Sequence, residues 1–200
     1  MTPLGEQPPG ATPLTDDDLV GLRQSWITTQ AELNKAEAGN VLRGRVWAFN
    51  RRGAFWYLEA GQIRSLHRRM FADVWEWAGQ FRLRETNLGV NFHDISVYLH
   101  DLCEDVKAQV GDRTKLAYPA DELAARFHHR LVSIHPFRNG NGRHSRLATD
   151  LLVRNLDQPP FTWGGAELSS SSATRSSYLS ALRRADRDND FTDLLAFARC

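Results

Sequence analysis

The segment from His135 to Arg146 reads His-Pro-Phe-Arg-Asn-Gly-Asn-Gly-Arg-His-Ser-Arg and combines a histidine, two glycines and spaced arginines. A neutral histidine beside a bound polyphosphate can take a proton from an incoming hydroxyl. Arg143 and Arg146 are three residues apart, so on a helix both side chains can face one phosphate chain. Phosphoryl and nucleotidyl transfers depend mainly on positioning and charge neutralisation. The segment therefore indicates a phosphate-transfer site with His135 as its general base.

Two helices are expected to position this segment. Apolar residues at helical spacing predict a helix over 121–134, which ends at His135-Pro136 because proline disfavours helical geometry in the residue before it. Gly140 and Gly142 let the backbone approach a ligand closely, and the next helix opens with N–H groups that bind anions. Each residue alone suits an ordinary helix–loop–helix corner, but the combination favours a catalytic site.

The rest of the sequence predicts an all-α domain with one exception. Apolar residues recur at helical spacing over these further ranges: 15–28, 32–49, 63–77, 95–106, 147–152, 173–185 and 191–199. Residues 81–94 are turn-rich and partly alternating, which predicts one small β-hairpin. The Pro- and Gly-rich residues 1–13 predict a flexible tail, so the domain spans 14–200, and the serine run at 169–172 is expected in a loop.

Composition excludes several classes of protein. The 200 residues suit one domain with a sizeable core, and a net charge of +1 argues against nucleic acid as a partner. No stretch approaches the roughly 20 apolar residues of a membrane span, and the N-terminus lacks the features of a signal peptide. The two cysteines have no metal-binding or disulfide spacing, so the expected location is the cytoplasm.

The segment resembles the signature of the Fic (Fic/Doc) family, His-x-Phe-x-[Asp/Glu]-Gly-Asn-[Gly/Lys]-Arg-x-x-Arg. Every position matches except Asn139, which stands where the family has an acid. Residues 66–82, ending in Trp-Ala-Gly-Gln-Phe-Arg, and residues 125–130 also resemble family helices, so the resemblance covers about 14–200. The chain is most similar to the subgroup called mobile mystery protein B, found on mobile elements, where asparagine at this position is usual. The resemblance implies a Fic-type helical bundle with a small β-hairpin flap.

The resemblance also implies an activity, protein adenylyltransferase. Such an enzyme transfers AMP from ATP, with Mg²⁺, to a Ser, Thr or Tyr hydroxyl of another protein or of itself. His135 would be the general base, and Arg143 and Arg146 would bind the β- and γ-phosphates. The anion hole for the nucleotide phosphates would be formed by Gly140, Asn141 and Gly142.

Two alternatives remain open, the first of them because of Asn139. In the family the acid helps to hold Mg²⁺, and an amide oxygen is a weaker, neutral ligand. One alternative is therefore a catalytically weak or degenerate module that binds nucleotide and regulates a partner. The other is an enzyme that transfers a different phosphate-linked group, such as UMP or phosphocholine. An antitoxin or regulator is a further partner that the resemblance suggests.

The predicted hairpin has an implied role. By resemblance it would be a flap that pairs with the backbone of the target protein, a form of strand addition. The alternative is a plain surface hairpin. The residues expected to form the flap are Thr86, Asn87, Leu88, Gly89 and Val90.

An inhibitory helix is expected near residues 15–33. Many Fic proteins carry a brake that reads [Ser/Thr]-x-x-x-Glu-[Gly/Asn], and Thr28 and Glu32 fit its first and fifth positions, although Leu33 departs at the last. The resemblance then implies that Glu32 pairs with Arg146. The alternative is that Glu32 is an ordinary exposed acid in the first turn of a helix.

Overall fold

A computed structural model describes residues 4, 12–112, 116–165 and 173–200. The serine run and all of the tail except Leu4, Thr12 and Pro13 lie outside these residues. The described elements are α1 (Asp16–Val20), α2 (Gln30–Phe49), α3 (Ala60–Phe71), a 3₁₀ turn η1 (Phe92–Asp94), α4 (Ile95–Val110), α5 (Ala120–Ile134), α6 (Asn141–Asn155), α7 (Ala173–Asp188) and α8 (Thr192–Arg199).

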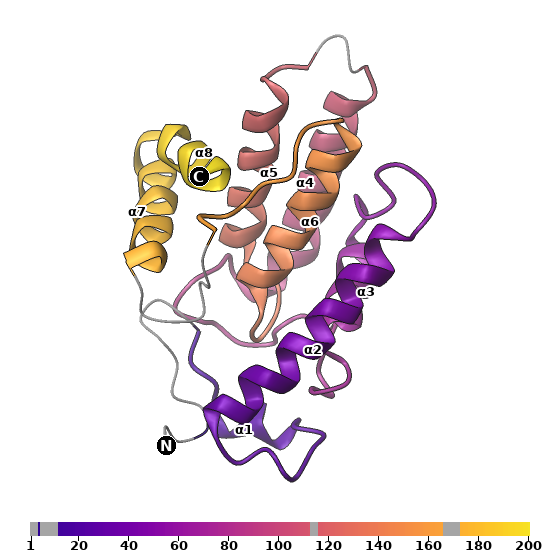
Figure 1. The fold of residues 1–200 in the computed structure, drawn as a ribbon, viewed down its shortest axis with the longest axis vertical. Coiled ribbons are helices and arrows are strands. Elements are labelled where there is room, and N and C mark those ends of the chain that lie inside the picture. Colours follow the sequence, from indigo (N-terminus) through magenta and orange to yellow (C-terminus); the bar gives the residue numbers. More distant parts are fainter. Residues whose placement is uncertain (1–3, 5–11, 113–115, 166–172) are drawn as a thin grey trace.

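Helices α5 and α6 pack against each other at the centre of the molecule (Figure 1). Helix α4 covers one side of α5, the α2–α3 pair packs on α6, and α7 and α8 pack together beside α5. The main hydrophobic core lies among α2 to α6, and a smaller cluster lies between α5, α7 and α8. The prediction of a helical domain is confirmed, and its most central elements are the two that flank the candidate site.

Helix α2 begins and packs for reasons visible in its sequence. The hydroxyl of Thr29 accepts a hydrogen bond from the backbone N–H of Glu32, and the Glu32 carboxylate accepts one from the N–H of Thr29, so the two residues form a capping box. At Gly44 an added Cβ would lie 2.9 Å from the Cα of Met70 in α3. Glycine therefore allows α2 and α3 to approach closely.

The first predicted helix is shorter than expected. The apolar spacing over 15–28 predicted a continuous helix, whereas α1 ends at Val20. Leu22 forms an isolated antiparallel bridge with Trp75, so the chain after α1 is extended along the segment that follows α3. Backbone pairing with a distant segment outweighs the local helical spacing here.

The third predicted helix also ends early. Helix α3 stops at Phe71, although the buried stripe continues through Trp75 and Trp77, whose rings stack 4.8 Å apart. The backbone N–H of Gly79 donates to Nδ1 of His67 over 3.0 Å. This contact requires the chain to fold back on the helix, so the residues after Phe71 form turns.

The predicted hairpin is not formed among the described residues. Residues 81–91 are irregular and η1 follows them, with one isolated bridge between Phe81 and Phe137. The guanidinium of Arg82 donates to the carbonyls of Arg84 and Val90, so a side chain holds the loop where strand pairing was expected.

In the described part of the chain, no helix is both long and apolar enough to cross a membrane.

Candidate active site

His135 ends α5 in a left-handed conformation, with φ 51° and ψ 58°. The proline that follows prevents the helix from continuing, and the left-handed turn moves the imidazole away from the helix axis. The residue is 7% exposed, and its Nε2 lies 2.8 Å from the hydroxyl of Thr12. The predicted base is thus positioned at a helix end with one ring nitrogen in contact with a hydroxyl group.

Arg82 fixes the backbone of His135, a role that the sequence did not reveal. Its Nε donates to the carbonyl of His135 over 2.8 Å, and its backbone N–H donates to the carbonyl of Pro136 over 3.0 Å. The side chain is 1% exposed and also holds Val90. The available signal was its place at the end of the Trp-Ala-Gly-Gln-Phe-Arg segment that resembles a family helix, and a buried charge needs several acceptors.

Burial keeps His135 in the form that a base requires. Burial lowers the pKa of His135 to about 4, the backbone carbonyl of Val132 opposes the shift, and the nearby charge of Arg82 adds to it. The imidazole is therefore neutral at pH 7 and can accept a proton. A bound triphosphate would raise this pKa because a nearby negative charge favours the protonated ring.

The loop between the two helices is held by Asn141. Its Oδ1 accepts from the N–H of Phe137 over 2.9 Å, and its Nδ2 donates to the Phe137 carbonyl over 2.8 Å. The Phe137 ring is fully buried and stacks on His67 with ring centroids 3.8 Å apart. Asn141 was predicted in the anion hole; its side chain shapes the loop, which leaves its backbone for that role.

Gly140 precedes α6 with φ +78°, and an added Cβ would lie 2.6 Å from the ring of Phe71. Among the residues that the structure describes, no side chain caps the N-terminus of α6. Because the first N–H groups of a helix have no partner within it, this end is suited to bind phosphate oxygens. Gly142 lies in this first turn, where an added Cβ would be 3.6 Å from Nη1 of Arg146.

Arg143 forms an ion pair with Glu37, an acid that no sequence motif indicated. Its Nη1 lies 2.7 Å from Oε2 of Glu37 in α2, and its guanidinium lies over the ring of Phe71. The other carboxylate oxygen of Glu37 accepts from Nε1 of Trp75 over 2.7 Å. Glu37 is 5% exposed, so its hydrogen bonds to Arg143 and Trp75 offset the cost of burying the carboxylate. Glu37 therefore competes with a bound phosphate for the guanidinium of Arg143.

Arg146 lies one turn further along α6. Its guanidinium is 5.8 Å from the ring centroid of Tyr178, and burial lowers its pKa while the Tyr178 hydroxyl opposes the shift. Its Nη1 lies beside Gly142, so the guanidinium of Arg146 lies near the start of the helix. Arg143 and Arg146 both lie in the first turns of α6, but Arg143 contacts Glu37 of α2 and Arg146 lies beside Tyr178 of α7. That both bind one phosphate chain stays a prediction.

The predicted Glu32–Arg146 pair is not formed. The Glu32 carboxylate accepts from the backbone N–H groups of Thr28 and Thr29 over 2.9 and 3.0 Å. These hydrogen bonds lower the pKa of Glu32. Its carboxylate is therefore part of the helix cap, because the first-turn position that fits the motif spacing also suits capping.

Asn139 binds two backbone groups. Its Oδ1 accepts from the N–H of Gly140 over 2.7 Å, and its Nδ2 donates to the carbonyl of Thr12 over 3.0 Å. In the described ranges, no three His, Cys, Asp or Glu side chains gather as a metal site. A single neutral oxygen that already accepts a hydrogen bond does not fit a protein-held Mg²⁺ ion.

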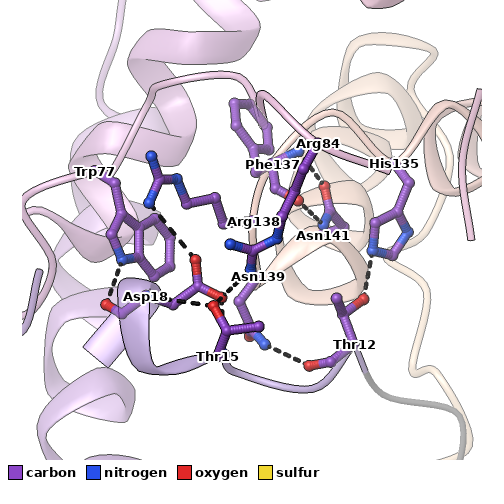
Figure 2. A network of polar contacts seen from close by, with 10 residues as sticks. All are labelled: Thr12, Thr15, Asp18, Trp77, Arg84, His135, Phe137, Arg138, Asn139 and Asn141. Carbon is purple, nitrogen blue, oxygen red and sulfur yellow. Dashed lines mark hydrogen bonds and ion pairs between the residues drawn. The ribbon is translucent and has the colours of Figure 1, made fainter. Parts of the chain in front are cut away.

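Thr12 was expected in a flexible tail, but it is 7% exposed and contacts both ends of the motif loop (Figure 2). It bonds His135 through its side chain and Asn139 through its carbonyl. Composition does not reveal hydrogen bonds to distant residues, so the contacts of Thr12 were not predicted.

The predicted flap residues lie beside the base. Val90 donates its N–H to the carbonyl of Ile134 over 3.4 Å, and an added Cβ at Gly89 would lie 2.9 Å from the Cβ of His135. The hydroxyl of Thr86 contacts the carbonyl of Leu88, which closes a tight turn in the loop. The structure thus brings this segment to the site without the strand geometry that was predicted.

Residues 57–153 match the model of the Fic/DOC family, a span that contains both motif helices and the loop. The chain belongs to the Fic/DOC family. It is 32% identical over 132 residues to a probable protein adenylyltransferase of Sinorhizobium fredii, covering 64% of this chain and 65% of that protein. It is 51% identical over 39 residues to a uridine 5′-monophosphate transferase of Xanthomonas campestris, covering 20% of this chain and 7% of that protein.

The fold has close counterparts among solved structures. The N-terminal Fic domain of a cell filamentation protein of Bartonella quintana, solved with bound ADP, superposes with a TM-score of 0.65. The two share 20% identity over 88% of this chain and 86% of that one, which shows a common fold. The chain spans less than two thirds of the length of the curated relatives it matches: 65% of the Sinorhizobium protein and 20% of protein adenylyltransferase fic-1 of Caenorhabditis elegans.

Proposed function

We propose that this domain is a protein adenylyltransferase that transfers AMP from ATP to a hydroxyl group of a protein. The observation that carries the proposal is the contact of His135 Nε2 with a hydroxyl at 2.8 Å, beside a loop that leads into an uncapped helix N-terminus. The names of the relatives, protein adenylyltransferase in Sinorhizobium and in Caenorhabditis, agree with this chemistry.

The reaction follows from the roles of these groups. The neutral imidazole of His135 takes the proton of the acceptor hydroxyl, whose oxygen attacks the α-phosphorus of ATP. The first N–H groups of α6 stabilise the charge on the phosphate oxygens, and Arg143 and Arg146 neutralise the departing pyrophosphate. The α-phosphorus bond to the bridging oxygen breaks, and a phosphodiester to the acceptor forms.

Transfer of UMP is a second candidate, favoured by the match to the Xanthomonas uridine 5′-monophosphate transferase. The phosphate-binding groups that we describe do not contact the base, so they serve either nucleotide. Competition between labelled ATP and UTP distinguishes AMP transfer from UMP transfer. Preferential labelling from UTP would show that the transferred group is UMP.

Several finer assignments accompany the proposal. Residues 86–90 are proposed to bind the target's backbone, supported by their contact with His135 through Gly89. Mg²⁺ is proposed to enter with the ATP phosphates, because the domain itself offers one neutral oxygen at Asn139. A cytoplasmic location is proposed from the cysteine usage. Membership of the mobile mystery protein B subgroup and a partner antitoxin or regulator are proposed from the family resemblance alone.

The test uses α-labelled ATP with the purified chain and a cell lysate. His135→Ala is expected to lower label transfer by about 10²–10⁴-fold while folding and ATP binding remain. His129→Ala is the matched control, since His129 bonds Asp186 away from the site. Equal transfer by the wild-type and His135→Ala proteins would refute the mechanism. ATP binding without transfer in the wild type would instead favour the degenerate binding module.

A further inference from the structure

The segment before α1 places a hydroxyl of this chain on the catalytic base. Thr12 Oγ1 lies 2.8 Å from His135 Nε2, and both residues are 7% exposed (Figure 2). This distance lies within the range in which a general base removes a proton. The hydroxyl of Thr12 thus lies where the hydroxyl of an acceptor protein is required.

A second contact holds Thr12 from its backbone side. The carbonyl of Thr12 accepts from Nδ2 of Asn139, and the other end of that amide accepts from the N–H of Gly140. A carboxylate at this position has no hydrogen to donate to a carbonyl. Asparagine is therefore the side chain that can bind the loop and Thr12 together.

Asp18 anchors the segment a few residues later. It is fully buried, accepts from the hydroxyl of Thr15 over 3.0 Å, and lies 3.6 Å from Nη1 of Arg138 in the motif loop. Arg84, in the segment next to the predicted flap, also pairs with Asp18 (Figure 2). The carbonyl of Asp18 accepts from Nε1 of Trp77 over 3.1 Å. Asp18 thus joins the N-terminal segment, which contains Thr12, to both sides of the site.

We propose that Thr12 is a self-modification site, adenylylated by His135 of the same chain. This inference rests on the proposed adenylyltransferase function. The Oγ1 of Thr12 attacks the α-phosphorus of ATP, and its proton passes to Nε2 of His135. The bond from the α-phosphorus to the bridging oxygen breaks, pyrophosphate leaves, and Thr12 carries AMP as a phosphodiester.

The experiment incubates the purified full chain with α-labelled ATP and no other protein, then maps the labelled peptide. Thr12→Val keeps the shape of the side chain without its hydroxyl and is expected to lower self-labelling by about tenfold or more, because the positioned acceptor is lost. Thr12→Ser restores a hydroxyl and is expected to restore labelling. Thr28→Val is the control, since Thr28 is exposed and contacts only the α2 cap.

A mixing experiment tests whether transfer occurs within one chain. His135→Ala chains retain Thr12 but lack the base, and Thr12→Val chains retain the base but lack the acceptor. If transfer is intramolecular, neither chain in the mixture is labelled at residue 12. Label on Thr12 of the His135→Ala chain would show transfer between chains and would overturn the intramolecular assignment.

Lysate proteins, added in parallel, separate failure of this inference from failure of the proposed function. Self-labelling that maps to another residue, or persists in Thr12→Val, overturns the Thr12 site even when lysate proteins are labelled. In that case the adenylyltransferase proposal stands. Absence of any label, in the wild type and in Glu37→Gln, where Arg143 is released, overturns both.

Discussion

The pair between Arg143 and Glu37 is expected to restrain the site, and Glu37→Gln tests this directly. The substitution keeps the size of the side chain and an oxygen that can accept from Trp75, so the packing of α2 is retained. It removes the negative charge that holds Arg143 at 2.7 Å. Arg143 is then free to bind the phosphates of ATP.

The magnitude follows from the exposure of the two partners. A hydrogen bond between charged groups contributes about 1.5–3 kcal/mol, and the Arg143 side chain is 33% exposed, so screening places the pair near the lower end. The Glu37 side chain is only 7% exposed, and its negative charge opposes the binding of phosphates beside Arg143. Glu37→Gln is therefore expected to tighten ATP binding and raise label transfer by about tenfold or more.

The assay measures ATP affinity by calorimetry and transfer by α-labelled ATP. Glu32→Gln is the matched control, because Glu32 lies on the same helix but its carboxylate bonds only Thr28 and Thr29. The control is expected to weaken the helix cap slightly without changing transfer. Increased transfer in Glu32→Gln with none in Glu37→Gln would refute the assignment of the restraint to Glu37. No change in either variant would show that the ion pair does not limit nucleotide binding.

Three further predictions follow from the buried polar groups. Because the pKa of His135 is about 4, its ring is expected to stay neutral from about pH 8 to 5.5 in the nucleotide-free chain, as followed by NMR; a titration centred near pH 6.5 would contradict the burial of the base. Asn139→Asp is expected to lower self-labelling of Thr12 and to reduce the Mg²⁺ concentration needed for transfer to other proteins; unchanged self-labelling would refute the role of the amide. Burial lowers the pKa of His128 to about 3, so between about pH 6.5 and 3 only the unfolded state binds this proton. The free energy of unfolding therefore decreases as the pH decreases, by up to about 1.4 kcal/mol per pH unit. His128→Gln is expected to reduce that slope by about one proton relative to the neighbouring control His129→Gln; equal slopes would refute the shift.

The motif loop was predictable because its signals are local. A proline after His135 ends α5, and Gly140 has a positive φ that other residues rarely adopt, so the helix–loop–helix arrangement follows from adjacent residues. The same reasoning failed for the helix over 15–28, where the backbone of Leu22 pairs with Trp75. That pairing depends on a segment more than fifty residues away, and helical spacing contains no information about it.

The choice between Glu32 and Glu37 shows how a spacing rule can select the wrong acid. The two residues are five apart, so they project about 140° apart around α2. Glu32 belongs to the first turn and caps the helix, whereas Glu37 shares a face with the buried residues Leu33, Asn40 and Gly44. An acid on an apolar helical face requires a buried cation or donor. Of the three residues named on this face only Leu33 is apolar, so the sequence does not mark the face as buried and did not identify Glu37.

The contact between Asn139 and the N-terminal segment gives a reason for the asparagine that departs from the family motif. The residue that stands in place of the family's acid was interpreted as a weaker metal ligand, which suggested a loss of activity. In the structure the amide supplies a hydrogen to the Thr12 carbonyl, a contact that an ionised acid cannot make. The change that removes a charged metal ligand therefore adds the bond that holds a hydroxyl on His135. The departure from the motif is better explained by an acceptor within the chain than by degeneration of the site.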